Sequence, residues 1–434
     1  MKCKYCKAKI SANDKKCPKC KRPVSQQENT AGKRSVLIFS SVALLVSLGV
    51  VLLVAMLGGW DLGSWFRGKE NDVYYKKDYT VKDRKVKKKR DVVVATAGDA
   101  KLTNAMLQIY YWRQVHDFQD QYGSTASYFG LDFSKDLAEQ TYLDGKTTWQ
   151  QYFLTSALEA WQSNQAFAAL AKQNGYELPE EYQEFLANVD QHLEDVAAES
   201  GYSSADAMVK AEVGVTCTAA DYAEYLRVYY WGYLYFRELY DAMEPTEEEI
   251  DKYFQENEAS YEESGITKDG SVFVDIRHIM LYPDNGKMSA AGTVYYSQED
   301  WDECLAQAEK LLSTWKNGEM TEDSFAELAK EHSEDTTTKS KGGLYTDVSK
   351  GDLMKAIDTW CFDAARKTGD YTLVKTDYGY HLIYFVEAEE VWHAEVRTTL
   401  RTQMGQEMVN ETLKDFVLDV DYKQIVLGSA NLSN

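Results

Sequence analysis

An uncharged and strongly apolar stretch from Ser35 to Trp60 limits what this chain can fold into. It contains 26 residues, more than the roughly 20 that an α-helix needs to cross ~30 Å of hydrocarbon. A cleavable signal peptide usually has an apolar region of only about 7–15 residues near the N-terminus, whereas 34 residues precede this stretch. The sequence therefore predicts a single uncleaved transmembrane helix at residues 35–60.

Charge divides the chain unevenly. Residues 1–90 hold 22 Lys/Arg and 7 Asp/Glu, a net charge of +15, whereas the remaining residues hold 26 against 62, a net charge of −36. A strongly acidic body repels nucleic acid, so we expect no nucleic-acid partner. The basic residues at 61–90 are predicted to form a juxtamembrane stalk along phospholipid head groups.

Four cysteines before the apolar stretch form two C-x2-C pairs separated by ten residues. Two such pairs supply the four thiolates of a tetrahedral zinc site, although four redox thiols are the alternative. We expect residues 1–24 to be a zinc ribbon with a structural zinc ion, and residues 25–34 to be a flexible linker. The expected zinc ligands are Cys3, Cys6, Cys17 and Cys20.

Reduced, metal-bound thiolates suit the cytosol, which predicts a cytosolic N-terminus and an extracytoplasmic body. The count of basic residues does not decide the orientation, because 11 precede the span and another 11 lie between Arg67 and Arg90. Lys33 and Arg34 adjoin the span directly, and basic residues close to a span have the greatest influence. We predict a single-pass protein of the cell membrane.

Residues 91–265 have the periodicity of a mostly α-helical domain. A capping box at Thr147 and Gln150 predicts the start of one helix. A later helix, from about Thr218, carries the aromatic-rich sequence YAEYLRVYYWGYLYFRELYDAM. Apolar residues around much of its circumference predict a central core helix, whereas the alternative is an exposed groove that binds unfolded chains.

The pattern changes between Val272 and Val386. An apolar strand, VFVDIRHIML, precedes amphipathic helices at 301–316 and 321–331, and the strand DYGYHLIYFV closes the block. The motifs in chain order are RHIM (277–280), FAELAKEHSED (325–335), SKGGL (340–344), KGDLM (350–354) and TDYGYHLI (376–383). This ordered set resembles a parvulin-type peptidyl-prolyl isomerase (PPIase) domain, which we place at residues 266–389.

The resemblance implies catalysis of X–Pro isomerisation without a metal or cofactor. Unaided, this isomerisation takes about tens to hundreds of seconds, because rotation breaks amide resonance. The resemblance places His278 and His381 back to back in the sheet core, joined by hydrogen bonds, with Thr376 as their polar partner. It places Asp335 beside the substrate carbonyl. Without the resemblance, Asp335 is equally suited to cap a turn in SEDTTT, and the histidines to be structural core residues.

The resemblance also implies an apolar proline pocket. Leu344 and Leu353 fall on positions that line the pocket in this family. Ile357 stands where a phenylalanine is usual, Val348 stands near another usual aromatic residue, and Tyr345 replaces a glycine. We therefore expect a shallower pocket, and weak or lost catalysis is an alternative outcome.

Residues 390–434 return to a helical pattern and are expected to pack back on the helical domain. PrsA- and SurA-like secretion foldases have this arrangement, and residues 91–265 resemble their N-terminal domain in VATAGDAKLT and PTEEEIDKYFQEN. The predicted fold class is multidomain. It comprises a small zinc ribbon, a single transmembrane helix and a mostly α-helical chaperone domain with an inserted α+β parvulin domain.

The resemblance implies a membrane-anchored extracytoplasmic foldase whose partners are unfolded or nascent secreted polypeptides. A non-catalytic holdase or scaffold is the alternative, favoured by Ile357 and Val348, whereas intact His278, Asp335 and His381 favour the enzyme. A zinc-ribbon signalling protein is a third reading, but a 24-residue ribbon leaves little room for an effector domain. The sequence leaves open whether the chain forms a homodimer.

Overall fold

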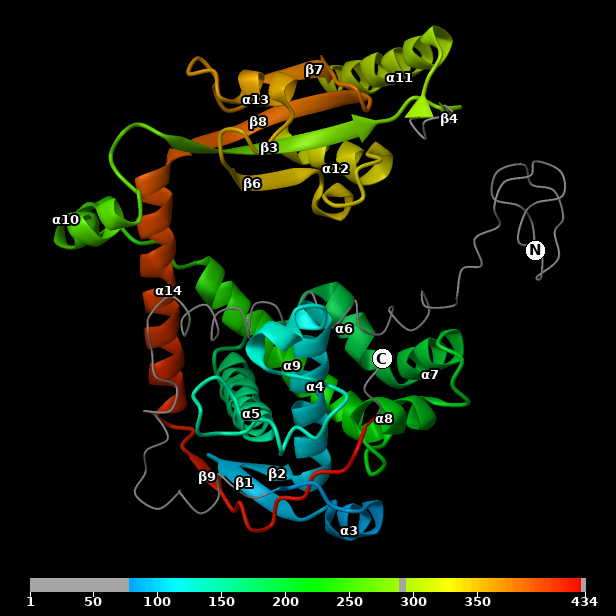
Figure 1. Cartoon of the computed structure of the whole chain (residues 1–434), viewed down its shortest axis with the longest axis vertical. Helices are drawn as coiled ribbons and strands as arrows, with labels where there is room; N and C mark the ends of the chain where they lie inside the picture. The colour runs from blue at the N-terminus through cyan, green and yellow to red at the C-terminus, as the bar shows by residue number, and fades with distance from the viewer. Residues whose placement is uncertain (1–77, 289–293, 431–434) are drawn as a thin grey trace, which may run out of the picture. The chain divides into compact units, whose positions relative to one another are not determined.

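The computed structural model describes residues 78–288 and 294–430 (Figure 1). The predicted span at 35–60 lies outside these residues, and so do the predicted zinc ligands Cys3, Cys6, Cys17 and Cys20. Within the described part of the chain, no helix combines the length and the apolar character that crossing a bilayer requires.

The chain divides into two compact units. The helical unit comprises the described residues up to 243 together with those from 402 onward, and the sheet unit comprises residues 244–401. The sheet unit is therefore inserted in the sequence of the helical unit. One helix, α14 (Val391–Leu413), contributes residues to both units.

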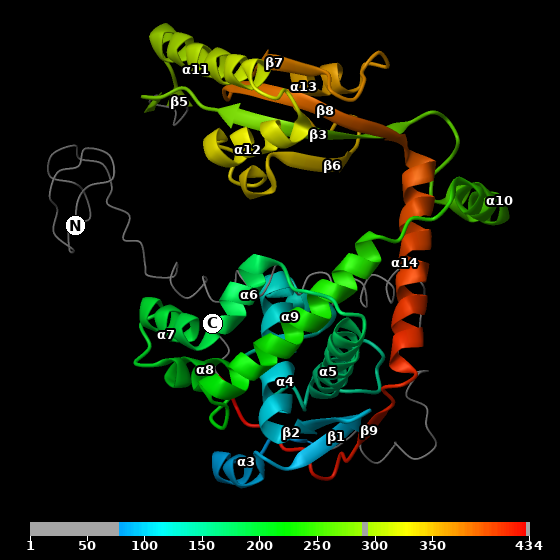
Figure 2. The same ribbon diagram turned by 180° about the vertical axis from the view of Figure 1, so that it is seen from behind.

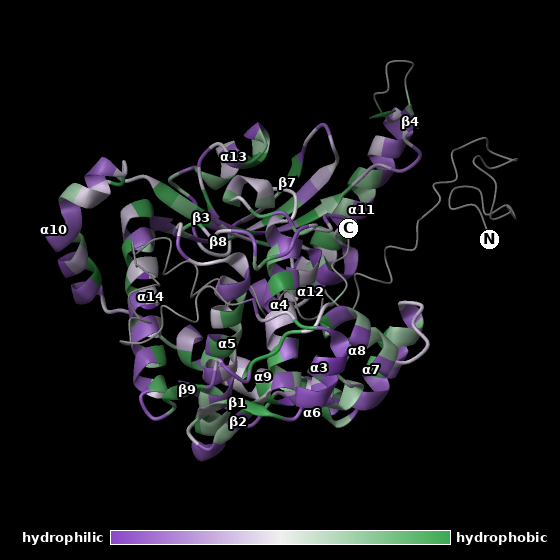
Figure 3. Ribbon diagram, turned by 60° about the horizontal axis from the view of Figure 1, so that its bottom comes forward, coloured by the Kyte–Doolittle hydropathy of each residue, from purple (hydrophilic) through white to green (hydrophobic). Residues whose placement is uncertain are grey.

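The helical unit combines seven helices before residue 243 with a small antiparallel sheet of order β2-β1-β9. In Figure 3, hydrophobic and hydrophilic stretches occur together on the longer helices of this unit. The strands are β1 (Val93–Ala97), β2 (Ala100–Thr103) and β9 (Leu418–Val420). The helices are α3 (Asp83–Lys89), α4 (Asn104–Tyr122), α5 (Trp149–Gln173), α6 (Glu180–Ala187), α7 (Val189–Glu199), α8 (Ala205–Val213) and α9 (Ala219–Asp241), with a 3-10 turn at Ala126–Phe129.

Residues 78–90 belong to the helical unit, which corrects the prediction that the whole basic stretch is a stalk. Tyr79 is 2% exposed and Val86 is fully buried. The backbone of Tyr79 also pairs with Leu427, whose N–H donates to the Tyr79 carbonyl at 2.9 Å. The many charged residues of this stretch led the sequence analysis to overlook Tyr79 and Val86, which are buried. The lysines of α3 around Val86 are mostly exposed.

The capping box at the start of α5 lies one residue later than predicted. The Thr148 hydroxyl accepts from the Gln151 N–H, and the Gln151 side chain accepts from the Thr148 N–H. Thr147 instead donates its hydroxyl proton to Asp144. The doublets Thr147–Thr148 and Gln150–Gln151 offer two registers with the same spacing, so the sequence pattern did not distinguish them.

The aromatic residues of α9 confirm the prediction of a core helix. Tyr225, Tyr229 and Tyr233 are 4%, 3% and 6% exposed. Their rings contact one another along the helix, with centroids 5.8 and 5.5 Å apart and interplanar angles of 22° and 5°. These side chains fill the interior of the helical unit, so they do not line an exposed groove for client chains.

Polar side chains on one face of α4 bind the C-terminal segment. Asn104, Gln108 and Trp112 follow one another at the four-residue spacing that aligns side chains on a helix. Gln108 accepts from the Gly428 N–H at 2.6 Å and donates to the Gly428 carbonyl, which also accepts from the Trp112 indole at 3.0 Å. Asn104 accepts from the Val426 N–H at 3.0 Å. These contacts anchor the end of the described chain.

Replacing Gln108 with alanine should destabilise the helical unit by about 2–3 kcal/mol, because the buried Gly428 N–H loses its acceptor. Urea denaturation of the full chain measures the change. The matched control is Gln183→Ala, which removes an exposed glutamine that donates to a backbone carbonyl. It should cost less than about 0.5 kcal/mol. Equal losses in the two variants would contradict the argument.

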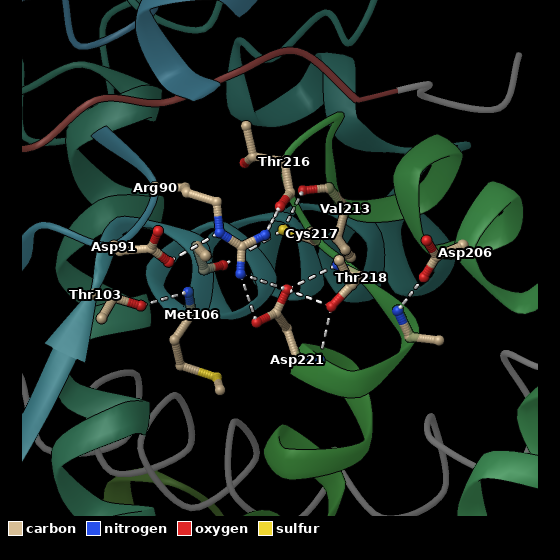
Figure 4. A network of polar contacts seen from close by, with 12 residues as sticks. Arg90, Asp91, Thr103, Met106, Asp206, Val213, Thr216, Cys217, Thr218 and Asp221 are labelled. Carbon is tan, nitrogen blue, oxygen red and sulfur yellow. Dashed lines mark hydrogen bonds and ion pairs between the residues drawn. The ribbon is translucent and has the colours of Figure 1, made fainter. Parts of the chain in front are cut away.

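A second polar network ties the start of the unit to α9 (Figure 4). Arg90 donates to the Thr216 carbonyl at 2.5 Å and to both Asp221 oxygens at 3.0 and 3.2 Å. Asp221 also accepts from the N–H and hydroxyl of Thr218, the N-cap of α9. The Arg90 carbonyl accepts from the Ala105 N–H at the start of α4. One arginine therefore joins three chain segments.

The sheet unit contains a four-stranded antiparallel sheet of order β6-β3-β8-β7 (Figure 2). The strands are β3 (Val272–Leu281), β6 (Leu344–Val348), β7 (Tyr371–Lys375) and β8 (Tyr380–Glu390), with a two-residue pair β4 (Lys287–Met288) and β5 (Val294–Tyr295). The helices are α10 (Glu247–Glu263), α11 (Gln298–Asn317), α12 (Glu322–His332) and α13 (Lys355–Cys361). The predicted helices at 301–316 and 321–331 correspond to α11 and α12.

Helices cover both faces of this sheet. Ile279 and Leu281 of β3 share an apolar cluster with Trp315 of α11 and Phe325 of α12. Ile276, on the opposite face of β3, shares another cluster with α13. Because side chains alternate along a strand, His278 lies on the same face as Ile276.

The ends of α14 belong to different apolar clusters. Trp392 and Val396 contact Ile250 and Phe254 of α10 within the sheet unit. Near the other end, Met408 packs in a cluster of the helical unit with residues of α5 and α9. The C-terminal helix therefore packs on the helical unit over its second half.

Candidate functional site

Four polar residues from three separate stretches of the sequence meet on the α13 face of the sheet. His278 Nε2 lies 2.6 Å from His381 Nδ1, and the two rings stack with centroids 4.9 Å apart. His381 Nε2 lies 2.7 Å from the Thr376 hydroxyl. His278 Nδ1 lies 3.7 Å from Asp335 Oδ2. The hydrogen bonds expected between the histidines and Thr376 are therefore present.

Strand register brings the two histidines together. Met280 of β3 pairs with His381, and His278 pairs with Ile383 of β8, so the histidines are diagonal neighbours on one face. On its other side, β3 is held close to the SKGGL loop, where the His278 N–H donates to the Gly343 carbonyl at 2.9 Å. Both imidazoles are buried, with 6% and 0% of the residue exposed.

Asp335 lies in the turn after α12 and is surrounded by hydrogen-bond donors. Oδ1 accepts from the N–H and hydroxyl of Thr337, at 3.0 and 2.5 Å. Oδ2 accepts from the Thr338 hydroxyl at 2.7 Å and from the Tyr345 hydroxyl at 2.9 Å. Asp335 therefore caps its turn and also faces His278. A turn-capping role does not exclude a role beside the substrate carbonyl.

The charge state of Asp335 follows from these donors. Partial burial acts to raise the pKa of the carboxyl, but the hydrogen bonds from Thr337, Thr338 and Tyr345 outweigh burial. They hold the pKa of Asp335 well below its usual range, since each donor favours the charged form. The site therefore contains a fixed anion at neutral pH.

Burial lowers the pKa of His278 to about 4, although the nearby Asp335 charge opposes the shift. Burial, together with the neighbouring His278, likewise lowers the pKa of His381 to about 4. Both imidazoles are neutral at pH 7. The Asp335 anion favours a proton on His278 Nδ1, so His278 Nε2 accepts from His381 Nδ1 and His381 Nε2 accepts from Thr376.

We expect both imidazoles to stay neutral when the pH falls to about 5, as measured by ¹⁵N NMR of the histidine side chains. The unfolded chain binds these protons near pH 6.5 and the folded chain near pH 4. Stability from the pair is therefore present above about pH 6.5 and is lost as the pH falls towards 4, on the order of 3 kcal/mol per imidazole. A midpoint near 6.5 for either imidazole would contradict the assignment.

An apolar cluster adjoins this polar group on the same face. Val348 and Ile357 are buried, at 6% and 3% exposure, and Leu353 packs against them. Tyr345 belongs to the same cluster. Leu344, which was expected beside them, is not part of this cluster.

The backbone of β6 explains why Leu344 lies outside the cluster. Leu344 pairs with Arg277, and Tyr345 pairs with Ile276, so Tyr345 faces α13 and Leu344 faces the opposite side. The register shifts before Val348, and Asp347 has a φ of 52°. This irregularity places Tyr345 and Val348 on one face although they are three residues apart, which strict alternation did not reveal.

The site thus places a fixed negative charge beside an apolar cluster on one face of the sheet. Residues 278–387 match the protein family described as "Rotamase: PPIC-type PPIASE domain". These residues form a PPIC-type, parvulin peptidyl-prolyl isomerase domain.

The proteins that this chain resembles include foldases. The chain is 36% identical over 85 residues to foldase protein PrsA 1 of Listeria innocua, covering 20% of this chain and 28% of that protein. It is 27% identical over 212 residues to foldase protein PrsA 2 of Listeria monocytogenes, covering 42% of this chain and 70% of that protein. The first alignment thus spans less than a third of the length of that relative.

Among solved structures, PrsA from Bacillus subtilis is 20% identical to this chain, with a TM-score of 0.27. The match covers 63% of this chain and 87% of that structure.

Proposed function

We propose that the chain is a membrane-anchored extracytoplasmic foldase that isomerises X–Pro bonds in unfolded or nascent secreted polypeptides. The observation that carries this proposal is the fixed Asp335 anion beside the paired histidines, next to the apolar cluster of Tyr345 and Val348. Similarity to PrsA foldases supports the client class.

Asp335 acts through its charge. In a planar amide the nitrogen lone pair gives the carbonyl oxygen a partial negative charge, which is withdrawn when the bond twists. An anion held beside that oxygen raises the free energy of the planar bond more than that of the twisted bond. The barrier therefore falls, because the site favours the transition state over the ground state.

The neutral histidine pair positions the anion and takes no proton from the substrate. His278 presents its Nδ1 to Asp335, and the stacked His381 and Thr376 fix the orientation of the ring. Isomerisation makes and breaks no covalent bond, so the site needs no proton transfer. Hydrogen bonds that hold His278 in one orientation are sufficient for this role.

A non-catalytic holdase is the second candidate. Val348 and Ile357 are short aliphatic residues within a closed cluster, which leaves less apolar surface for a proline ring than aromatic residues would. In that case the isomerase domain would bind client peptides without accelerating their isomerisation.

The test is exchange NMR of short X–Pro peptides, with X varied, in the presence of the full chain purified in detergent. Catalysis predicts faster cis–trans exchange for at least one peptide at catalytic protein concentration. If the folded chain accelerated exchange in none of the peptides, the proposal of catalysis would be contradicted. Suppression of the aggregation of an unfolded client would then support the holdase.

The proposal includes the anchor and the ribbon. A cytosolic ribbon with a structural zinc ion on Cys3, Cys6, Cys17 and Cys20, and a span at 35–60, rest on the spacing and composition of those residues. Deletion of 35–60 should release the protein from membranes, and the purified full chain should contain about one zinc ion per molecule.

A further inference from the structure

Tyr345 connects the apolar part of the isomerase site to its anion. Its ring packs in the cluster with Val348 and Ile357, and its hydroxyl donates to Asp335 Oδ2 at 2.9 Å. The ring centroid lies 5.9 Å from that of His278. One side chain therefore touches both parts of the site.

We propose that Tyr345 is a positioning residue, whose hydroxyl holds the Asp335 carboxylate in place while its ring forms the wall against which the substrate proline packs. This inference rests on the proposed isomerase function. It assigns the residue that couples binding of the proline to the orientation of the anion.

The origin of each donor distinguishes Tyr345 from the others. Thr337 and Thr338 lie in the same turn as Asp335, so their hydrogen bonds fix the carboxylate only relative to that turn. Tyr345 comes from β6, which pairs with the strand that carries His278. Its hydrogen bond therefore adds to the contact of His278 with Asp335, and it ties the carboxylate to the sheet that carries the histidines.

Among the described residues, the one recorded ion-pair contact of Asp335 is with His278. From β3, His278 is neutral, and so is His381 behind it on β8, because burial lowers the pKa of both imidazoles. Glu334 precedes Asp335 and accepts from the Tyr282 N–H, so it adds negative charge nearby. Donors such as the Tyr345 hydroxyl therefore compensate the charge of Asp335 in place of a cation.

The hydroxyl and the ring of Tyr345 should have separable effects. Tyr345→Phe keeps the wall and removes the donor, so kcat should fall about three- to tenfold while KM stays within about twofold. Tyr345→Ala removes the wall as well, so KM should also rise. Exchange NMR with a series of peptide concentrations separates the two parameters.

Two further variants make the comparison sharp. Thr338→Val removes another donor to Asp335 Oδ2 with little change in shape, so it should lower kcat in the same direction as Tyr345→Phe. Tyr261→Phe is the matched control. It removes a tyrosine hydroxyl that bonds Thr399 elsewhere in the sheet unit, and it should leave both kinetic parameters unchanged.

A direct readout keeps the inference independent of activity. With ¹³Cγ-labelled aspartate, and the Asp335 resonance assigned by its loss in Asp335→Asn, the pKa of Asp335 should rise towards its ordinary value in Tyr345→Phe and not in Tyr261→Phe. An unchanged Asp335 titration, or an unchanged kcat in an active protein, would overturn the positioning role. An inactive wild type would overturn the proposed function instead, while the titration would still decide whether Tyr345 holds the carboxylate.

Discussion

Replacing Gly343 with alanine is expected to unfold the sheet unit and to abolish isomerase activity. Gly343 has a φ of +74°, and a Cβ atom there would lie 2.2 Å from the His278 carbonyl oxygen and 3.0 Å from its nitrogen. Both atoms are backbone, so the clash is relieved only if β3 and β6 separate at His278. We expect a loss of more than about 4 kcal/mol in the free energy of unfolding, which exceeds the cost of most single substitutions.

Gly351→Ala provides the matched control for this prediction. Gly351 also has a positive φ, +104°, but no atom lies within 4 Å of the position of an added Cβ. This variant carries the backbone strain without the clash and should cost only about 1–2 kcal/mol. Thermal unfolding followed by circular dichroism, together with peptide exchange rates, measures both variants. A Gly343→Ala protein as stable as Gly351→Ala would show that the close approach of β3 and β6 is not essential.

Replacing Asp335 with asparagine is expected to lower kcat/KM for X–Pro peptides at least about tenfold, because the charge disappears while the shape remains. The asparagine oxygen still accepts from Thr337, so the turn should be retained. Stability should therefore change much less than activity. Exchange NMR and urea denaturation of the same sample separate the two effects.

Asp377→Asn is the control for the loss of a charge near the site. Asp377 is exposed and follows Thr376, so its substitution changes the net charge by the same amount at the rim of the site. Its activity should remain within about twofold of wild type, because an exposed charge is screened by solvent. If both variants lost activity equally, general electrostatics would explain the effect better than a fixed anion.

The sequence predicted the isomerase domain well because its motifs are local and ordered. RHIM and TDYGYHLI each lie on one strand with a histidine at a fixed place, so pairing the strands was enough to bring His278 and His381 together. The aromatic helix was also predicted as core, since Tyr225 and Tyr229 lie among apolar residues at helical spacing. In these cases local pattern and tertiary packing agree.

The sequence failed where position depends on an irregular backbone or on distant partners. The register shift beside Asp347 puts Tyr345 and Val348 on the α13 face and Leu344 on the other, and no periodic pattern in the sequence predicts such a shift. The charge of residues 82–90 suggested a solvated stalk, although Val86 is buried against the C-terminal segment near Gly428. Long-range partners of this kind leave no signal in local composition.

The insertion of the sheet unit also sets an order of events during synthesis. Gln108 meets Gly428 across 320 residues, and β1 pairs with β9. The helical unit therefore lacks a strand and its polar anchor until residues 418–428 have been made, whereas residues 244–401 form a continuous segment that is complete earlier. Because chains emerge from the N-terminus and domains fold as units, the isomerase domain is expected to reach its native state first. The helical unit, although it is synthesised first, is expected to complete its fold only after β9 has been made.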